Sequence, residues 1–415
     1  MKVLVEKATR QHLRNHNSRL LLRMIYDADE ISRADLARQT NLTRTTVSEV
    51  VSELIEQGLV KEVGQAPAGV GRTPTLLSVV EDSRQIVAVN ITTYELQGAI
   101  VNLRGGIRHR ARLQLLGQDG DAVLAQLGPF IDDLVTCASA PLLGIGISAP
   151  GLIDTTNGIA RQAVNFGWHD VPLRSLVQAH SNLPVYVAND GHTIALAEYM
   201  FGARQNVPNL VAIKVGQGIG AGIVLEGQLF AGDEYGAGEI GHVVVEEHGL
   251  PCKCGNAGCL ETVASIPALI HRAQLLAQRD PSSLLNQLTP PGAEVTFDAV
   301  LQAFRAGDPG VQQIVAAIGR YLGIGVANLI GALGIRYVAI TGRVAPFGEL
   351  LRETILAEVH RRVLPLIAQK TTIEIVAQGP DMVCLGAAVL LLTNELGLTR
   401  LLPKEKLGGL AELAA

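Results

Sequence analysis

Residues Cys252–Glu261 read CKCGNAGCLE and hold three of the five cysteines of this 415-residue chain, with His242 ten residues upstream of the first. Three thiolates and one imidazole complete a tetrahedral shell for Zn²⁺, and such a shell is structural because it leaves no open position for water. A disulfide is the alternative, but cysteines in a C-x-C pair bridge poorly and three thiols leave one unpaired. The spacing therefore predicts one structural zinc ion, bound by His242, Cys252, Cys254 and Cys259.

The composition is that of a multidomain α/β protein. A chain of 415 residues exceeds one ordinary core, so two or three domains are expected. It is 48% hydrophobic, 4% aromatic and rich in glycine, which suits an aliphatic, turn-rich α/β protein rather than a disordered one. No apolar run reaches about 18 charge-free residues and the N-terminus lacks the apolar core of a signal peptide, so we expect no membrane insertion and a cytoplasmic location. Cys137 and Cys384 have apolar neighbours and are expected to be buried.

The charge is distributed unevenly along the chain. Residues 1–80 carry 11 Lys and Arg against 9 Asp and Glu, a balance of +2, whereas the remaining residues carry 23 against 30, a balance of −7. A basic head on an acidic body suggests a nucleic-acid-binding module joined to a second function.

Residues 1–80 show the pattern of a winged helix-turn-helix. Apolar residues recur at helical spacing over 13–25, and Ser32 is placed to cap a short helix over 33–39. Thr43 is placed to cap a longer helix from Arg44 to about Gln57, which Gly58 ends. This spacing places polar residues at the start of the second helix, where such helices contact bases and phosphates in the major groove.

Two strands are expected beyond that helix, over 59–64 and 75–80, around a Gly/Pro-rich tip. The tip presents Arg72, and a narrow A·T-rich minor groove attracts such an arginine. A helical hairpin used for protein contacts is the alternative. The predicted DNA-binding residues are Arg33, Thr43, Arg44, Thr45, Thr46, Ser48 and Arg72.

From residue 86 onward short apolar strands alternate with helices. Asn189 and Asp190 end the apolar strand 185–188 and precede a helix. Polar side chains at the carboxyl end of a strand either bind a ligand or cap the helix that follows, and the residues alone leave both readings open.

Four motifs together indicate a family: GEIGH at 238–242, the run 252–261, AND at 188–190, and APG at 149–151. With them the chain closely resembles the ROK family (repressors, open reading frames and kinases), specifically its branch of sugar-responsive repressors, over nearly its whole length. The resemblance implies an α/β fold in which the winged helix is followed by two actin-like lobes of the ATPase and sugar-kinase type, with a structural zinc site. The first lobe is expected at 81–190, completed by about 335–400, and the second lobe, with the zinc site and a dimerisation surface, at 191–334.

The resemblance also implies a sugar site. Carboxylates accept hydrogen bonds from sugar hydroxyls, and Asn and His side chains donate in return. His242 would then serve both the metal and the sugar. The alternative is that Glu239 and Glu261 are solvated surface acids. The implied sugar-binding residues are Asn165, Asn189, Asp190, Glu239, His242 and Glu261.

ATP binding is not expected. In the family's kinases the residue at the position of Asp190 is the general base, and the first phosphate loop reads D-x-G-G-T, whereas residues 90–94 here read NITTY. The loop 216–222 keeps its glycines, with Gln217 in place of the usual Thr. Arg343 replaces a glycine of the adenosine site. We therefore expect no catalytic residues.

The sequence as a whole predicts a sugar-responsive transcription factor, a repressor that binds an inverted-repeat operator in double-stranded DNA as a homodimer or homotetramer. Its expected effector is a monosaccharide such as glucose or xylose, with N-acetylglucosamine as a further candidate. A sugar kinase with an added DNA-binding head is the first alternative. A constitutive DNA binder whose zinc domain only dimerises is the second.

Overall fold

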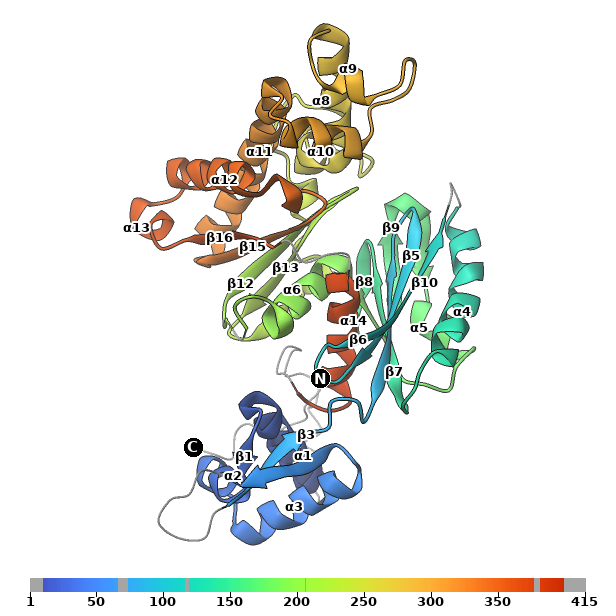
Figure 1. The fold of residues 1–415 in the computed structure, drawn as a ribbon, viewed down its shortest axis with the longest axis vertical. Helices are drawn as coiled ribbons and strands as arrows, with labels where there is room; N and C mark the ends of the chain where they lie inside the picture. The colour runs from blue at the N-terminus through green and yellow to red at the C-terminus, as the bar shows by residue number, and fades with distance from the viewer. Residues whose placement is uncertain (1–9, 66–73, 116–118, 206, 377–380, 399–415) are drawn as a thin grey trace, which may run out of the picture. The chain divides into compact units, whose positions relative to one another are not determined.

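A computed structural model describes residues 10–65, 74–115, 119–205, 207–376 and 381–398 (Figure 1). The chain divides into two compact units. Unit 1 comprises Met1–Ile147, Pro172–Val187 and Ala387–Ala415, and unit 2 comprises Ser148–Val171 and Ala188–Gly386.

The first element of unit 1 is the predicted winged helix. Its second and third helices are capped as expected: Ser32 accepts from the N–H of Asp35, and Thr43 from that of Thr46. One face of the third helix packs inward through Val47, Val50, Val51 and Leu54. A three-stranded sheet of order β1-β3-β2 completes the domain. The elements are α1 (Arg10–Ala28), β1 (Ile31–Ser32), α2 (Arg33–Thr40), α3 (Arg44–Glu56), β2 (Val60–Gln65) and β3 (Thr75–Val79).

The remainder of unit 1 is built on a five-stranded sheet of order β11-β7-β4-β5-β6. Helix α4 packs on this sheet, where Gly98 leaves room for the side chains of Leu134 and Phe130. The elements are β4 (Gln85–Ile91), β5 (Glu95–Asn102), β6 (Ile107–Gln114), α4 (Gly120–Thr136), β7 (Leu142–Ala149), α5 (Leu173–Gln178) and β11 (Val185–Asn189).

Several hydrogen bonds attach the winged helix to the rest of unit 1. The Arg19 guanidinium on α1 donates to the main-chain carbonyl of Asn394, at the end of α14 (Asp381–Asn394), over 2.9 Å. Arg104 donates to the carbonyl of Tyr26 over 2.7 Å and pairs with Asp29. A cation at a helix C-terminus is favourable because the last carbonyls lack helical partners.

Unit 2 contains a second five-stranded sheet, of order β14-β13-β12-β15-β16 (Figure 1). Strand β12 pairs antiparallel with β13 and parallel with β15, which pairs parallel with β16. Counted along the chain, both large sheets have the order 3-2-1-4-5, so the fold repeats one arrangement twice, as two actin-like lobes require. The strands are β12 (Leu210–Val215), β13 (Ile219–Leu225), β14 (Gln228–Phe230), β15 (Tyr337–Gly342) and β16 (Thr372–Ile375).

The two faces of this sheet are covered by different helices. Val211, Ile213 and Val215 join an apolar core with helices α8, α10, α11 and α12. Helix α6 packs against β12 and β13. The helices are α6 (Asp190–Phe201), α7 (Leu260–Ala264), α8 (Ile266–Arg279), α9 (Leu285–Leu288), α10 (Phe297–Arg305), α11 (Pro309–Leu333), α12 (Gly348–Arg362) and α13 (Pro365–Ala368).

A small three-stranded sheet also belongs to unit 2, in the order β10-β9-β8. The rings of Phe166 and Trp168 stack beside it, with centroids 4.5 Å apart. Its strands and the short 3-10 turns of the unit are β8 (Leu152–Asp154), β9 (Ile159–Ala163), η1 (Val164–Phe166), β10 (Trp168–Val171), η2 (Asp233–Tyr235), η3 (Ile240–His242) and η4 (Ala345–Phe347).

The expected lobe boundaries need correction. Residues 335–386 belong to unit 2, because β15 and β16 extend its sheet, so the expectation that about 335–400 completes the first lobe holds only from Ala387 onward. Ser148–Val171 and Ala188–Asp190 also belong to unit 2, although 81–190 was expected to form the first lobe. Cys137, expected to be buried, is exposed, whereas Cys384 is buried.

Helix α11 is long and apolar enough to cross a membrane by length and composition, with a mean hydropathy of 1.6 over its most apolar window. Half of that window is buried within the fold, and the helix packs against α7, α8 and α12. Its buried side includes Val315, Leu322 and Ile330. These contacts are typical of a core helix.

Candidate functional site

The cysteine run forms a tight loop that returns on itself in unit 2. Isolated bridges join Val244 to Cys259 and Pro251 to Ala257. Gly258 has a φ of +74°, and a Cβ there would lie 1.7 Å from the carbonyl oxygen of Glu246, so only glycine fits. The loop therefore brings residues from both of its ends together.

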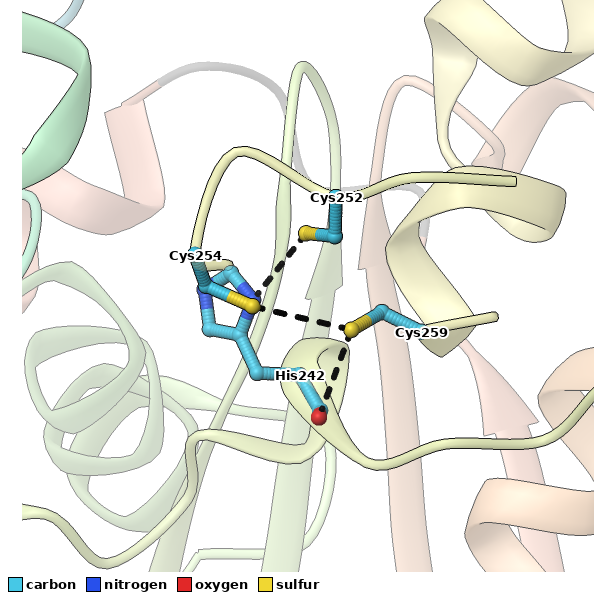
Figure 2. A group of neighbouring side chains, drawn as sticks. All are labelled: His242, Cys252, Cys254 and Cys259. Atoms are coloured by element: carbon cyan, nitrogen blue, oxygen red, sulfur yellow. Dashed lines mark hydrogen bonds between the residues drawn. The ribbon is translucent and has the colours of Figure 1, made fainter. Parts of the chain in front are cut away.

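The four predicted metal ligands converge in this loop (Figure 2). Their ligand atoms all lie within 4.8 Å of one another. The Cys252 sulfur lies 3.6 Å from Nδ1 of His242, and the Cys254 and Cys259 sulfurs lie 3.7 Å apart, too far for a disulfide. Tetrahedral zinc places two sulfurs about 3.8 Å apart, and sulfur and nitrogen about 3.6 Å apart. The spacing thus suits a tetrahedral metal ion.

The pKa values of two of the cysteines are shifted in opposite directions. A hydrogen bond from the backbone of Asn256 lowers the pKa of Cys254, whereas burial raises the pKa of Cys259. Thiolates this close repel one another, and a bound cation removes that repulsion. The structure therefore contains a four-residue cluster, His242, Cys252, Cys254 and Cys259, with the chemistry and spacing to hold a metal ion.

Three carboxylates from separate segments lie next to this cluster. Burial, and then the neighbouring charges of Asp190 and Glu261, raise the pKa of Glu239 to about 7. An oxygen of Glu239 lies 3.9 Å from Nε2 of His242, the ring nitrogen turned away from the cysteines. The structure thus groups Asp190, Glu239, Glu261 and His242.

Backbone contacts hold two of these acids in place. An oxygen of Glu261 accepts the N–H of Ile219 over 3.1 Å, which ties the first turn of α7 to the start of β13. Gly238 has a φ of +97°, its carbonyl accepts from Ala221, and a Cβ would lie 1.9 Å from the Ala221 oxygen. This close approach fixes the position of Glu239.

The two predicted asparagines have different surroundings. The Asn189 side chain caps α6 by accepting from the N–H groups of Gly191 and His192, and donates to the carbonyl of Gly151 over 2.7 Å. The capping reading of Asn189 is therefore correct, and its effect is to fix Asp190 on the first turn. Asn165 is exposed, and its side-chain oxygen lies 3.5 Å from Nζ of Lys253 in the cysteine loop.

One charged residue near the grouped carboxylates, Lys214, was not predicted from the sequence. Lys214 on β12 forms an ion pair with Asp190, with 2.7 Å between Nζ and Oδ2. The available signal was a single lysine in the otherwise apolar strand LVAIKV.

Five of the seven predicted DNA-binding residues lie at the start of α3 or in its cap. Thr43 and Thr46 hydrogen-bond to each other in the cap, while Arg44, Thr45 and Ser48 are exposed. Arg33 pairs with Glu62 on β2 over 2.7 Å. Arg72, predicted to lie at the wing tip, is outside the described residues.

Chemically, clustered carboxylates beside an ammonium and an imidazole suit a neutral ligand with several hydroxyl groups. Each hydroxyl can donate to a carboxylate and accept from an N–H donor. The same acids disfavour an anionic ligand, because like charges repel at short range.

Comparison with known proteins gives matches along most of the chain. Residues 86–394 match the ROK family model, and residues 14–61 match a winged helix-turn-helix DNA-binding model. The chain is 32% identical to the xylose repressor of Caldicellulosiruptor bescii, over 92% of this chain and 97% of that protein. It is 33% identical to a glucokinase of Halalkalibacterium halodurans, over 75% of this chain and 96% of that protein.

A solved structure agrees with these matches. The ROK family transcriptional regulator described as a homologue of the Escherichia coli MLC protein has a TM-score of 0.81 at 28% identity, and the match covers 93% of this chain and 98% of the other. The winged helix, the repeated lobes and the family match together confirm the predicted fold class. The chain belongs to the ROK family.

Proposed function

We propose that this protein is a sugar-responsive transcriptional regulator, a repressor that binds operator DNA and changes its DNA affinity when a monosaccharide binds. One observation carries the proposal. The same chain contains a winged helix whose recognition helix begins with exposed polar residues and a ROK domain in which several carboxylates lie close together. The similarity to a xylose repressor over nearly the full length supports it.

In this proposal α3 enters the major groove and presents Arg44, Thr45 and Ser48 to bases and phosphates. One recognition helix reads too few base pairs to specify a site in a genome, so the protein acts as a homodimer or homotetramer. The operator is then an inverted repeat with half-sites one helical turn or a multiple apart. The exposed apolar side chains of Val243, Val244 and Leu250, beside the cysteine cluster, support a dimerisation surface there.

The proposed metal is zinc, with a structural role. Cys₃His is a common structural zinc set, and all four positions come from the protein. His242 and Cys259 lie three and two residues from Glu239 and Glu261, so the ion would hold both acids in a fixed relation. No catalytic chemistry is assigned to it.

The proposed effector is a neutral aldopyranose such as xylose or glucose, bound by Asp190, Glu239 and Glu261 with His242 and Asn165. Asn189 contributes by setting the first turn of α6. Such a regulator acts on DNA in the cytoplasm, which agrees with the lack of disulfides among the described cysteines.

A sugar kinase is the second candidate, favoured by the similarity to a glucokinase. The turn between β4 and β5 argues against it. The N–H of Thr92 is bound to the carbonyl of Glu95, and the N–H of Glu95 to the Thr92 hydroxyl, so these amides are not free for phosphate. Asp190, in the position of the kinase base, is already paired with Lys214.

One experiment separates the two functions. The purified protein is tested for operator binding by footprinting, with and without a panel of monosaccharides, and for phosphate transfer from ATP to the same sugars. A repressor gives a protected inverted repeat that one sugar alters, and no sugar phosphate. Phosphate transfer at the rate of an ordinary sugar kinase, or protection that no sugar alters, would contradict the proposal.

A further inference from the structure

Lys214 occupies an unusual place in the second sheet. Its neighbours Ile213 and Val215 point into the apolar core on one face, so Lys214 projects from the other face, which α6 covers. Across the sheet it is paired with Gly220 on β13 and with Thr341 on β15. Gly220 has no side chain there, and a Cβ would lie 3.8 Å from an oxygen of Asp190. The strand pairing thus leaves room for a long side chain to run toward Asp190.

The ammonium group of Lys214 can donate more hydrogen bonds than the one it gives to Asp190. One N–H is directed at Oδ2 of Asp190 over 2.7 Å, and no other partner is found among the described residues. Both side chains are about one-fifth accessible, at 22% and 21%. A lysine has three N–H donors, so two are left for a ligand or for water.

The pair has a specific recognition chemistry. A hydroxyl placed between the two groups donates its hydrogen to the Asp190 carboxylate and accepts an N–H from Lys214, so both of its hydrogen-bonding capacities are satisfied. A methylene in its place satisfies neither group. A phosphate ester has no hydrogen to donate and brings a negative charge next to Asp190.

We propose that Lys214 is a specificity-determining residue of the effector site, where Lys214 and Asp190 together form hydrogen bonds with one free hydroxyl of the monosaccharide. This inference rests on the proposed function, because it assumes that a sugar occupies the site. It goes beyond that function by identifying a residue outside the family motifs and by requiring an unsubstituted hydroxyl at one ring position.

The test combines removal of the ammonium with removal of single hydroxyls. The Kd values of the monosaccharide that binds the wild-type protein, and of each of its monodeoxy analogues, are measured for the wild type and for Lys214→Met, which keeps an unbranched apolar side chain. We expect Lys214→Met to weaken the parent sugar by about 10- to 150-fold, the range for a hydrogen bond to a charged group. For one monodeoxy analogue only, Lys214→Met and the wild type should have the same Kd. Asp190→Asn should bind that same analogue with the wild-type Kd as well.

The outcomes are distinct. If the wild-type protein binds no monosaccharide, the proposed function fails, and this inference with it. A second outcome is that the wild type binds a sugar while Lys214→Met weakens binding of the parent sugar and of every analogue by the same factor, or weakens none of them. In that case only the inference is overturned. Should Lys214→Met not fold, Lys214→Gln, which keeps an N–H donor, replaces it, and loss of folding in both variants would assign the lysine to the stability of the sheet instead.

Discussion

Substitution of Glu261 separates sugar recognition from loop support. One oxygen of Glu261 accepts the N–H of Ile219, and the other is available to a ligand. Glu261→Gln keeps a carbonyl oxygen for Ile219 but loses the charge and one acceptor. Glu261→Ala loses both and leaves the N–H of Ile219 without its partner.

The expected magnitudes differ for the two variants. Loss of one acceptor from the site costs about 1–3 kcal/mol, so Glu261→Gln should weaken sugar binding by about 5- to 150-fold with little change in melting temperature. Glu261→Ala should lose the same affinity and a further 1–3 kcal/mol or so of stability, at about 2–4 °C per kcal/mol for a unit of this size. Removing the neighbouring charge should also lower the pKa of Glu239 from about 7 in both variants.

Calorimetric titration with the sugar and thermal unfolding without it measure these effects. Wild-type sugar affinity in Glu261→Gln would show that Glu261 does not contact the effector. An unchanged melting temperature in Glu261→Ala would show that the bond to Ile219 does not support the loop. Both results together would refute the assignment of Glu261.

Three further predictions use other parts of the chain. Metal analysis should find about one zinc ion per chain. Cys254→Ser should lose the zinc and thermal stability, whereas the control Cys137→Ser, at an exposed cysteine, should keep both. Purified protein that contains no zinc and has freely titratable thiols would contradict this. Arg44→Ala should weaken operator binding and reduce the salt dependence by about one phosphate contact, without changing sugar affinity. Burial alone raises the pKa of Asp154, but hydrogen bonds from Asn157 and Arg161 outweigh it and hold that pKa at about 2, so the carboxylate adds stability above its ordinary pKa of 3.8 that is lost as the pH falls toward 2. Asp154→Asn should lower the melting temperature at pH 7 and remove this part of the acid dependence, and parallel pH profiles for both proteins would disprove it.

Local signals were sufficient to predict the winged helix. Ser32 and Thr43 cap α2 and α3 through bonds to residues three positions away, and the apolar periodicity of α3 appears as its buried face. Contacts of this kind lie within a few residues and can therefore be read from a single sequence.

The lobe boundary depends on distant contacts and was predicted wrongly. Strand β15 pairs with β12, more than 120 residues earlier in the chain, and nothing in its local pattern indicates which sheet it joins. The burial of Cys137 was also predicted wrongly: Cys137 is the C-cap of α4, and it is exposed although Leu134, three residues earlier, is buried.

The candidate site was predicted partly from local spacing and partly from the family resemblance. Its cysteines were predicted from spacing, because four ligands within 18 residues can reach one ion without knowledge of the fold. The acids come from three segments, so only the family resemblance could group them. Lys214 lies outside the motifs quoted above, and its ion pair with Asp190 depends on the packing of α6 against β12.

Two independent constraints hold the proposed sugar ligands on one sheet. Glu239 and Glu261 are attached to β13 through Gly238 and Ile219, and each lies within three residues of a candidate metal ligand. Asp190 is attached to β12 through Lys214 and has no metal ligand near it in sequence. If the proposed metal is bound, its removal should therefore loosen the two glutamates while the Asp190–Lys214 pair persists, because that pair joins α6 to β12 and includes no candidate metal ligand. A regulator built this way couples sugar affinity to metal content without making the whole site depend on it.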